Sequence, residues 1–191
     1  MAGHRERMVT SAALLIRERG ARPTAIADVL AHSGAPRGSA YHYFPGGRNQ
    51  LLCEAVDYAA DYVSGALSGT EESIEMLDIA VAFYRDGLLG SDYRAGCPVM
   101  AVAVEAGDPQ IGAEPVARAA AAFDRWRELI RESLLADGLA REEAADLATT
   151  VIAALEGALV MARAERDVAP LDAVHRQLRF LLDAATTKGT R

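Results

Sequence analysis

Residues 24–52 read TAIADVLAHSGAPRGSAYHYFPGGRNQLL, and this stretch decides how the rest of the chain is interpreted. Thr24 has the side chain of a favourable N-cap for a first helix over residues 25–32. Gly34 follows this helix, where glycine suits the left-handed conformation that often ends a helix. The first part of the stretch therefore predicts a short helix followed by a tight turn.

A second short helix follows that turn. Pro36 suits its first position, where the missing N–H would have no partner in any case. The helix extends to Phe44, and the Pro45-Gly46-Gly47 run ends it. Two short helices joined by a glycine turn form a helix-turn-helix. The exposed side of the second helix carries residue types that hydrogen-bond to phosphates and base edges, namely Arg37, Ser39, Tyr41, His42 and Tyr43.

The charge distribution is uneven along the chain. Residues 1–50 hold seven arginines against three acidic residues, a balance of +4, and residues 51–191 hold 13 basic and 24 acidic residues, a balance of −11, which together give the net charge of −7. A basic head on an acidic body is typical of a DNA-binding module joined to a regulatory domain. Charge alone leaves chance clustering of surface residues open as the alternative.

Composition favours a chain that folds in the cytoplasm. About half of the 191 residues are apolar, enough for a substantial core. We expect no transmembrane helix, because no run of about 18 apolar residues occurs, and the polar N-terminus does not resemble a secretory signal. The two cysteines, Cys53 and Cys97, lie far apart, which argues against a disulfide framework or a zinc ribbon.

Helical spacing of apolar residues continues along the whole chain and predicts an all-α fold. A three-helix head over residues 1–46 contains the helix-turn-helix and would bind DNA, and a five- or six-helix body spans residues 47–191. A helix over about 47–63 would connect the two domains. Residues 97–105 are rich in valine and are compatible with a strand, but a buried helix is favoured because no partner strand exists.

The segment over about residues 8–56 resembles the DNA-binding domain of the TetR family of bacterial transcriptional regulators. The matching positions are Thr24, Asp28, Val29, Gly34, Gly38, Tyr41, Tyr43, Phe44, Arg48 and Leu51. The run Gly96-Cys97-Pro98-Val99 is similar to the subgroup with an LmrA/YxaF-like C-terminal domain, as is the run from Ala35 to Ser39 that leads into Phe44–Gly47.

This resemblance implies that the second helix of the motif enters the major groove of DNA. Ala40 and Phe44 would then face the head, and Tyr43, Arg48 and Thr24 would contact phosphates. The alternative for the tyrosines is that one of them only packs the head. The full set of expected DNA-binding residues is Thr24, Arg37, Gly38, Ser39, Tyr41, His42, Tyr43 and Arg48.

The resemblance also implies an effector cavity and a dimer interface in the body. The apolar residues that would line the cavity, if they are not plain core, are Phe83, Met100, Val104, Phe123, Trp126, Ile130, Leu155 and Met161. The last two helices would form the interface between subunits, or else be buried within one subunit. We find no catalytic motif, no set of metal ligands and no cofactor signature.

The sequence thus predicts a homodimeric regulator that binds a pseudo-palindromic DNA operator. A repressor released by a small apolar or aromatic effector fits best, and an activator is also compatible with the sequence. The alternative from another class is a helical small-molecule-binding or enzymatic protein that keeps this fold without binding DNA. The basic residues of the head argue against that alternative.

Overall fold

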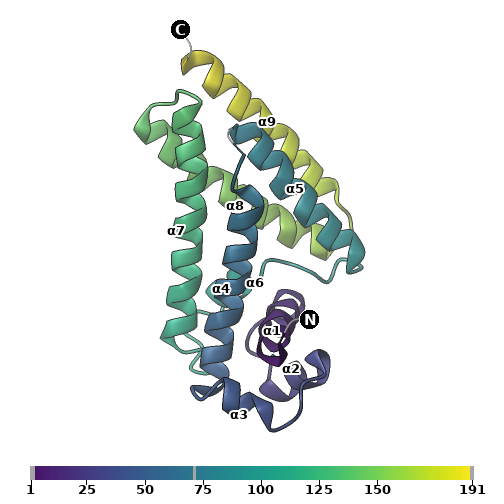
Figure 1. Ribbon diagram of the computed structural model, residues 1–191. Coiled ribbons are helices and arrows are strands. Elements are labelled where there is room, and N and C mark those ends of the chain that lie inside the picture. Colours follow the sequence, from purple (N-terminus) through teal and green to yellow (C-terminus); the bar gives the residue numbers. More distant parts are fainter. Residues whose placement is uncertain (1–2, 71, 190–191) are drawn as a thin grey trace. The chain divides into compact units, whose positions relative to one another are not determined.

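The structure is a computed structural model that describes residues 3–70 and 72–189, and every regular element in these ranges is a helix. The predicted all-α fold is therefore confirmed (Figure 1). The helices are α1 (His4–Arg19), α2 (Ile26–Ser33), α3 (Ser39–Tyr43), α4 (Gly47–Leu67), α5 (Ser73–Gly90), α6 (Pro98–Ala103), α7 (Ala113–Ala136), α8 (Arg141–Glu165) and α9 (Ala169–Gly189).

Two compact units divide the chain, and neither is continuous in sequence. The first comprises residues 1–62 and 97–122, and the second comprises residues 63–96 and 123–191. The long helices α4 and α7 each contribute to both units. The expected functional boundary between residues 46 and 47 stays a prediction, because it concerns which residues bind DNA rather than which residues pack together.

The first unit is built around α1, which packs against α2 and α6. Met8, Ala12 and Ile16 recur at helical spacing and have no exposed surface, so one face of α1 is wholly buried. Residues 98–103 form α6, which confirms a helix in place of a strand, but the helix is only partly buried: Val99 and Val102 are buried, and Val104 just after it is 69% exposed. Cys97 is the N-cap of α6, and its Sγ accepts a hydrogen bond from the Met100 N–H at 3.4 Å.

We expect the Cys97→Ser variant to be at least as stable as the parent protein, because a serine hydroxyl is a better N-cap acceptor than a thiol. Cys97→Ala should lower the free energy of unfolding by about 0.5–2 kcal/mol, since it leaves the Met100 N–H without its acceptor. Thermal unfolding of both variants checks this prediction. A Cys97→Ser variant that folds but is less stable than Cys97→Ala would contradict the capping role.

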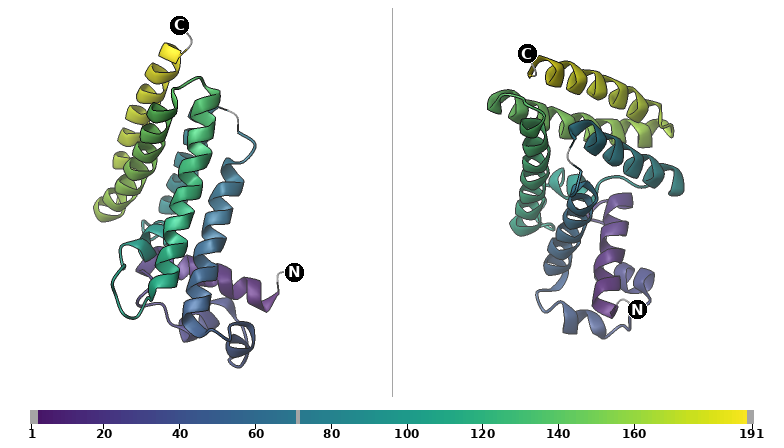
Figure 2. Two further views of the ribbon diagram at one scale, coloured as in Figure 1. Left: turned by 90° about the vertical axis from the view of Figure 1, so that its left-hand side faces the viewer. Right: turned by 45° about the horizontal axis from the view of Figure 1, so that its top comes forward.

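The second unit is centred on α5, which packs against both α8 and α9. Figure 2 shows α8 and α9 side by side in both views. Leu171, Leu178 and Leu182 of α9 are at most 2% exposed and form its inward face. By length and composition α8 would also suit a membrane span, but the helix packs against α5 and α9 within this unit.

Ion pairs join α5 to α9 beside this apolar contact. Asp78 accepts hydrogen bonds from His175 Nε2 at 2.6 Å and from Arg179, and Arg85 pairs with Asp172. Partial burial opposes ionisation of Asp78, but the hydrogen bonds from Arg179 and His175 outweigh it and lower the pKa of this carboxyl group.

Asp78→Asn should therefore reduce stability at neutral pH, and reduce it less in acid. A carboxylate whose pKa is lowered by folding stabilises the protein above its unfolded pKa of about 3.9, and this contribution disappears as the pH falls through the folded value. We expect a loss of less than about 1 kcal/mol at pH 7, because the pair is partly solvated. Urea unfolding at pH 7 and at pH 3 measures it, and an equal loss at both values would contradict the assignment.

Candidate DNA-binding site and effector cavity

The first helix of the motif is positioned by its own capping interactions. α2 begins at Ile26, and Ala25 is its N-cap, with the Ala25 N–H donating to Asp28 Oδ2 at 3.0 Å. The prediction that Thr24 caps this helix is wrong. Thr24 is 2% exposed and its hydroxyl donates to the Gly20 carbonyl at 2.8 Å. Gly34 adopts the left-handed conformation, with φ 66° and ψ 19°, which confirms the predicted helix end.

The second helix of the motif is shorter than predicted. α3 begins at Ser39 rather than at Pro36, and Ser39 donates both its N–H and its hydroxyl to the Pro36 carbonyl, at 2.9 and 2.7 Å. A turn therefore occupies the residues between them. Ala40 and Phe44 are each 1% exposed, which confirms that they face the interior of the head.

The opposite side of α3 is open to solvent. Tyr41 is 77% exposed, so it does not pack the head. Arg37, Gly38 and His42 are also exposed. Tyr43 is half-buried, and its ring lies edge-on to that of His42 with ring centroids 5.1 Å apart. The turn and α3 together present a cation, two phenols and an imidazole on one short segment.

Arg48, at the start of α4, has a different environment. Its guanidinium donates to four backbone carbonyls: Nε to Thr24 at 2.9 Å, Nη1 to Gln110 at 2.7 Å, and Nη2 to Ala21 at 2.5 Å and Arg22 at 3.1 Å. Partial burial lowers the pKa of Arg48, against the opposing effect of the nearby carboxylates Glu105 and Asp108. These contacts hold the α1–α2 loop against the loop that precedes α7.

Glu105 makes a second connection between the same two segments. Its Oε2 accepts the Arg22 N–H at 2.8 Å, and Arg22 also pairs with Asp108 at 3.4 Å. Gly20 has φ +92°, a backbone conformation that favours glycine, and a Cβ added there would lie 2.6 Å from Glu105 Oε1 and would displace this carboxylate. Nothing in the local sequence pattern pairs residues 20–24 with residues 105–110, so this arrangement was not predicted from the sequence.

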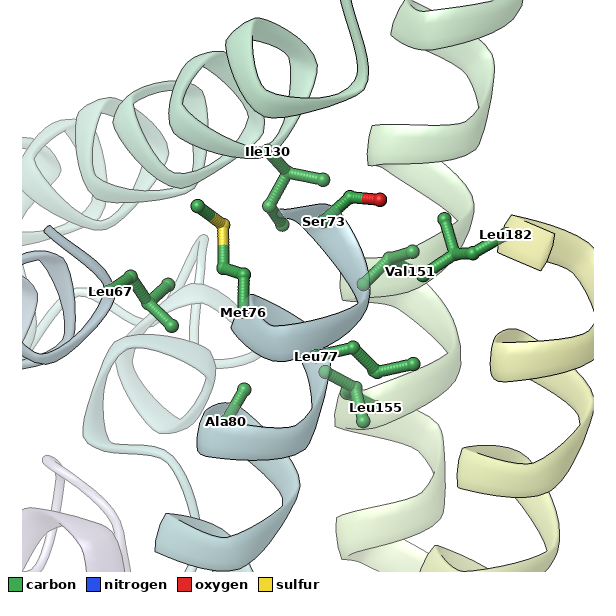
Figure 3. A pocket seen from close by; sticks show the side chains of 9 residues that line it. All are labelled: Leu67, Ser73, Met76, Leu77, Ala80, Ile130, Val151, Leu155 and Leu182. Carbon is green, nitrogen blue, oxygen red and sulfur yellow. The ribbon is translucent and has the colours of Figure 1, made fainter. Parts of the chain in front are cut away.

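A small apolar cavity lies within the second unit. It has a volume of about 20 Å³, with Met76, Leu77 and Ala80 of α5 and Val151 and Leu155 of α8 among its lining residues. One residue from each of α4, α7 and α9 and a single polar residue, Ser73, complete the lining (Figure 3). A cavity of this size has room for about one water molecule.

Two of the eight predicted cavity residues, Ile130 and Leu155, line this cavity. Val104 is 69% exposed and Met161 is 52% exposed, and neither contributes to it. Trp126 is buried and meets the edge of the Phe123 ring at a centroid distance of 5.7 Å, one helical turn before Ile130. Phe83 is half-buried beside Tyr84, and Met100 lies in the first unit.

Four of the nine exposed large apolar side chains among the described residues lie on α8 and α9, and the other five lie on α3, α4 and α5 and at the end of α6. Val160 and Met161 on α8 and Phe180 and Leu181 on α9 are between 44% and 68% exposed. Exposed apolar side chains on two neighbouring helices make α8 and α9 a candidate interaction surface. Apolar residues recur at spacings of 3 and 4 along α9, as in a single helical seam, but they are divided between two faces, because Leu171 and Leu178 are buried within the subunit whereas Leu181 is not.

An exposed short helix, presented by a helix-turn-helix on an otherwise helical protein, defines the class of helix-turn-helix transcriptional regulators. Residues 73–177 match the family model of the LmrA/YxaF-like C-terminal domain of transcriptional regulators. The chain is 58% identical to a helix-turn-helix transcriptional regulator of Mycobacterium tuberculosis H37Rv over the full length of both proteins. The chain belongs to the TetR family, in the subgroup with this C-terminal domain.

More distant relatives agree with this assignment. The regulator LmrA of Bacillus subtilis is 26% identical to the chain, over 87% of this chain and 90% of LmrA. A TetR transcriptional regulator from Chloroflexus aurantiacus is 31% identical, with a TM-score of 0.71 over 92% of this chain and 91% of its own. A regulatory protein TetR from Rhodobacter sphaeroides shares the fold, with a TM-score of 0.80 at 19% identity over 90% and 95% of the two chains.

Proposed function

We propose that this regulator is a homodimeric repressor in the cytoplasm, which binds a pseudo-palindromic operator and leaves it when a small apolar effector enters the body. The observation that carries the DNA-binding part is the open face of α3, where Tyr41 is 77% exposed while Ala40 and Phe44 anchor the helix from behind. A rigidly held helix with exposed polar side chains is what major-groove recognition requires.

The proposed DNA contacts divide into two kinds. Arg37, Tyr41 and His42 would reach base edges or phosphates from the exposed face, and Gly38 lets the backbone approach the duplex closely. Ser39 and Tyr43 would make contacts at the edges of this face. The side chains of Thr24 and Arg48 already donate hydrogen bonds to backbone carbonyls of the first unit. Their expected contacts with phosphates would require these hydrogen bonds to break.

The proposed dimer rests on the exposed apolar side chains of α8 and α9. Their contact with water is unfavourable, and a second copy of the chain would cover them. The effector part rests on the apolar cavity of the second unit. Effector binding would then change the affinity for DNA only to the extent that the effector binds one state of the dimer better than the other. We expect no catalytic turnover from this chain.

Selection of bound duplexes from a random DNA library, at a stated salt concentration, tests the proposal. We expect enrichment of a pseudo-palindrome with half-sites about one helical turn apart or slightly more. Binding that shows no sequence preference and no two-fold symmetry would favour the alternative, a helical small-molecule-binding protein without a DNA target. Whether the regulator represses or activates is then read from transcription in vitro on a template that carries the selected site.

Arg37→Ala should weaken operator binding by roughly 10-fold and reduce the slope of log K against log salt concentration by about one, because one cation fewer displaces counterions. Thermal stability should not change, since Arg37 is exposed. Arg141→Ala removes another exposed cation, at the start of α8, and serves as the control. Equal slopes for the parent protein and Arg37→Ala would remove Arg37 from the contact surface.

A further inference from the structure

A chain of polar contacts connects the start of α1 with the turn that follows α3. Arg5 Nη2 donates to Glu54 Oε2 of α4 at 2.7 Å. The other oxygen of this carboxylate, Oε1, accepts a hydrogen bond from Gln50 Nε2 at 2.9 Å. The side-chain oxygen of Gln50 in turn accepts the Gly46 N–H at 2.8 Å. Side chains of α1 and α4 therefore hold the backbone of the turn between α3 and α4.

Arg5 also contacts the residue that ends α3. Its guanidinium carbon lies 5.6 Å from the centroid of the Phe44 ring, within the range of a cation–π contact. Phe44 is the C-cap of α3 and is 1% exposed. Arg5 thus acts on this short turn at two points, at Phe44 directly and at Gly46 through Glu54 and Gln50.

The chemistry of Glu54 fixes the direction of these hydrogen bonds. An ionised carboxylate only accepts hydrogen bonds, so the amide nitrogen of Gln50 has to face Glu54. The amide oxygen of Gln50 is then directed at the N–H of Gly46, which needs an acceptor. Glu54 therefore acts on the turn without touching it, and Arg5 holds Glu54 in place.

Orientation, rather than stability, is what these contacts supply. The side chains of Arg5 and Glu54 are 52% and 21% exposed, and ion pairs that water reaches contribute little to the free energy of unfolding. α3 has only five residues, and a helix this short takes its direction from tertiary contacts because it is not stable by itself. Since α3 runs through the turn into α4 (Figure 1), the position of the turn sets where the exposed side chains of α3 point.

We propose that Arg5, Gln50 and Glu54 are positioning residues of the DNA-binding site, which fix the turn after α3 and so the direction in which α3 meets the major groove, without contacting DNA themselves. The inference rests on the proposed DNA-binding function. It predicts the opposite of what charge alone predicts for Glu54. Removal of a carboxylate from a DNA-binding head favours the approach of phosphates, whereas loss of positioning weakens recognition of the operator.

Glu54→Gln tests the proposal through sequence discrimination, the ratio of the affinities for the duplex selected from the random library and for a scrambled duplex of the same length and base composition. A glutamine has a single acceptor oxygen, so Arg5 and Gln50 no longer both find an acceptor at this position. We expect the ratio to fall by at least about 5-fold, the effect of one mismatched base pair. The affinity for the scrambled duplex should stay the same or rise.

Asp57→Asn is the matched control. It removes the same charge from the next turn of α4, where Asp57 pairs with Arg118 of α7 at 2.9 Å instead of with the turn after α3. This variant should keep the ratio of the parent protein. Circular dichroism verifies that both variants are folded.

Arg5→Ala separates positioning from a phosphate contact. The ratio should fall as in Glu54→Gln, and the slope of log K against log salt concentration should not change, because the charge of Arg5 is engaged by Glu54 and does not reach DNA. Combining the two substitutions should cause no further loss, since both residues act through one network. Without DNA, the amide hydrogen of Gly46 should exchange faster in both variants than in the parent protein and Asp57→Asn, as measured by NMR on the full-length chain.

An unchanged ratio in Glu54→Gln, or unchanged exchange at Gly46, would overturn the proposal. So would a salt slope that is smaller by about one in Arg5→Ala with an unchanged ratio, because Arg5 would then contact a phosphate. In each of these cases a parent protein that selects an operator keeps the proposed regulator function. A parent protein that selects no operator loses that function, and the contacts of Arg5 then only hold a surface turn.

Discussion

Phe180→Asp is expected to convert the protein to a folded monomer and to weaken operator binding by at least about 100-fold. Phe180 is 68% exposed in the single subunit, so an aspartate there meets only solvent until a second copy docks. In a dimer that buries α8 and α9 the same carboxylate would be unpaired in an apolar contact, which destabilises the assembly by several kcal/mol. The loss of operator affinity follows because two linked heads bind far more tightly than one.

Analytical ultracentrifugation at low micromolar concentration measures the assembly, and circular dichroism verifies that the subunit stays folded. Leu89→Asp is the matched control, because Leu89 is 51% exposed on α5, outside the proposed interface. It should leave the dimer intact. Leu178→Asp should instead unfold the subunit, since Leu178 is 2% exposed and packs inside it. A folded dimer of Phe180→Asp with unchanged affinity would place the interface elsewhere.

Arg48→Ala is expected to lower the free energy of unfolding by about 2–4 kcal/mol. The substitution removes all four hydrogen bonds from the guanidinium to the carbonyls of Ala21, Arg22, Thr24 and Gln110. Hydrogen bonds from charged groups contribute about 1.5–3 kcal/mol each, and we expect less than their sum because these carbonyls can recover water. Urea unfolding of the two proteins gives the difference directly.

Arg48→Lys separates the two roles that Arg48 can have. A lysine keeps the charge for a phosphate contact, but its compact ammonium group cannot span four carbonyls in a planar fork. If the structural role dominates, Arg48→Lys loses most of the stability that Arg48→Ala loses and retains the salt dependence of the parent protein. A stable Arg48→Ala with a salt slope smaller by about one would restore the phosphate contact as the main role.

The contacts of Arg48 also show that the compact unit around the helix-turn-helix extends beyond residue 46. Because Arg48 and Glu105 both bind the α1–α2 loop, the segment from α6 to the start of α7 belongs to the same compact unit as the helix-turn-helix. Arg118 of α7 strengthens the connection through its ion pair with Asp57 of α4 at 2.9 Å. A fragment that ends at residue 46 would lack all of these contacts and should be less stable than the head within the full chain.

Local rules predicted that the chain is helical and contains the motif, although they placed the N-cap of α2 at Thr24 and the start of α3 at Pro36. Apolar spacing of 3 and 4 residues predicts α1 because each helix must bury one stripe, and Met8, Ala12 and Ile16 do so. Gly34 ends α2 because the left-handed conformation there disfavours other residues. The resemblance to the TetR family implied that Ala40 and Phe44 face inward, and their burial agrees with the rule that residues four positions apart share one face of a helical turn.

Tertiary structure decided the partners of individual side chains. Leu178 and Leu181 belong to one apolar seam in the sequence, but packing on α5 and α8 buries the first and leaves the second exposed. The resemblance implied that Arg48 contacts a DNA phosphate. The fold instead places four backbone carbonyls around its guanidinium, one of them from a residue 62 positions away along the chain. Helical periodicity specifies a face, whereas the atoms that meet that face come from distant segments, so the role of a side chain follows only from the folded contacts.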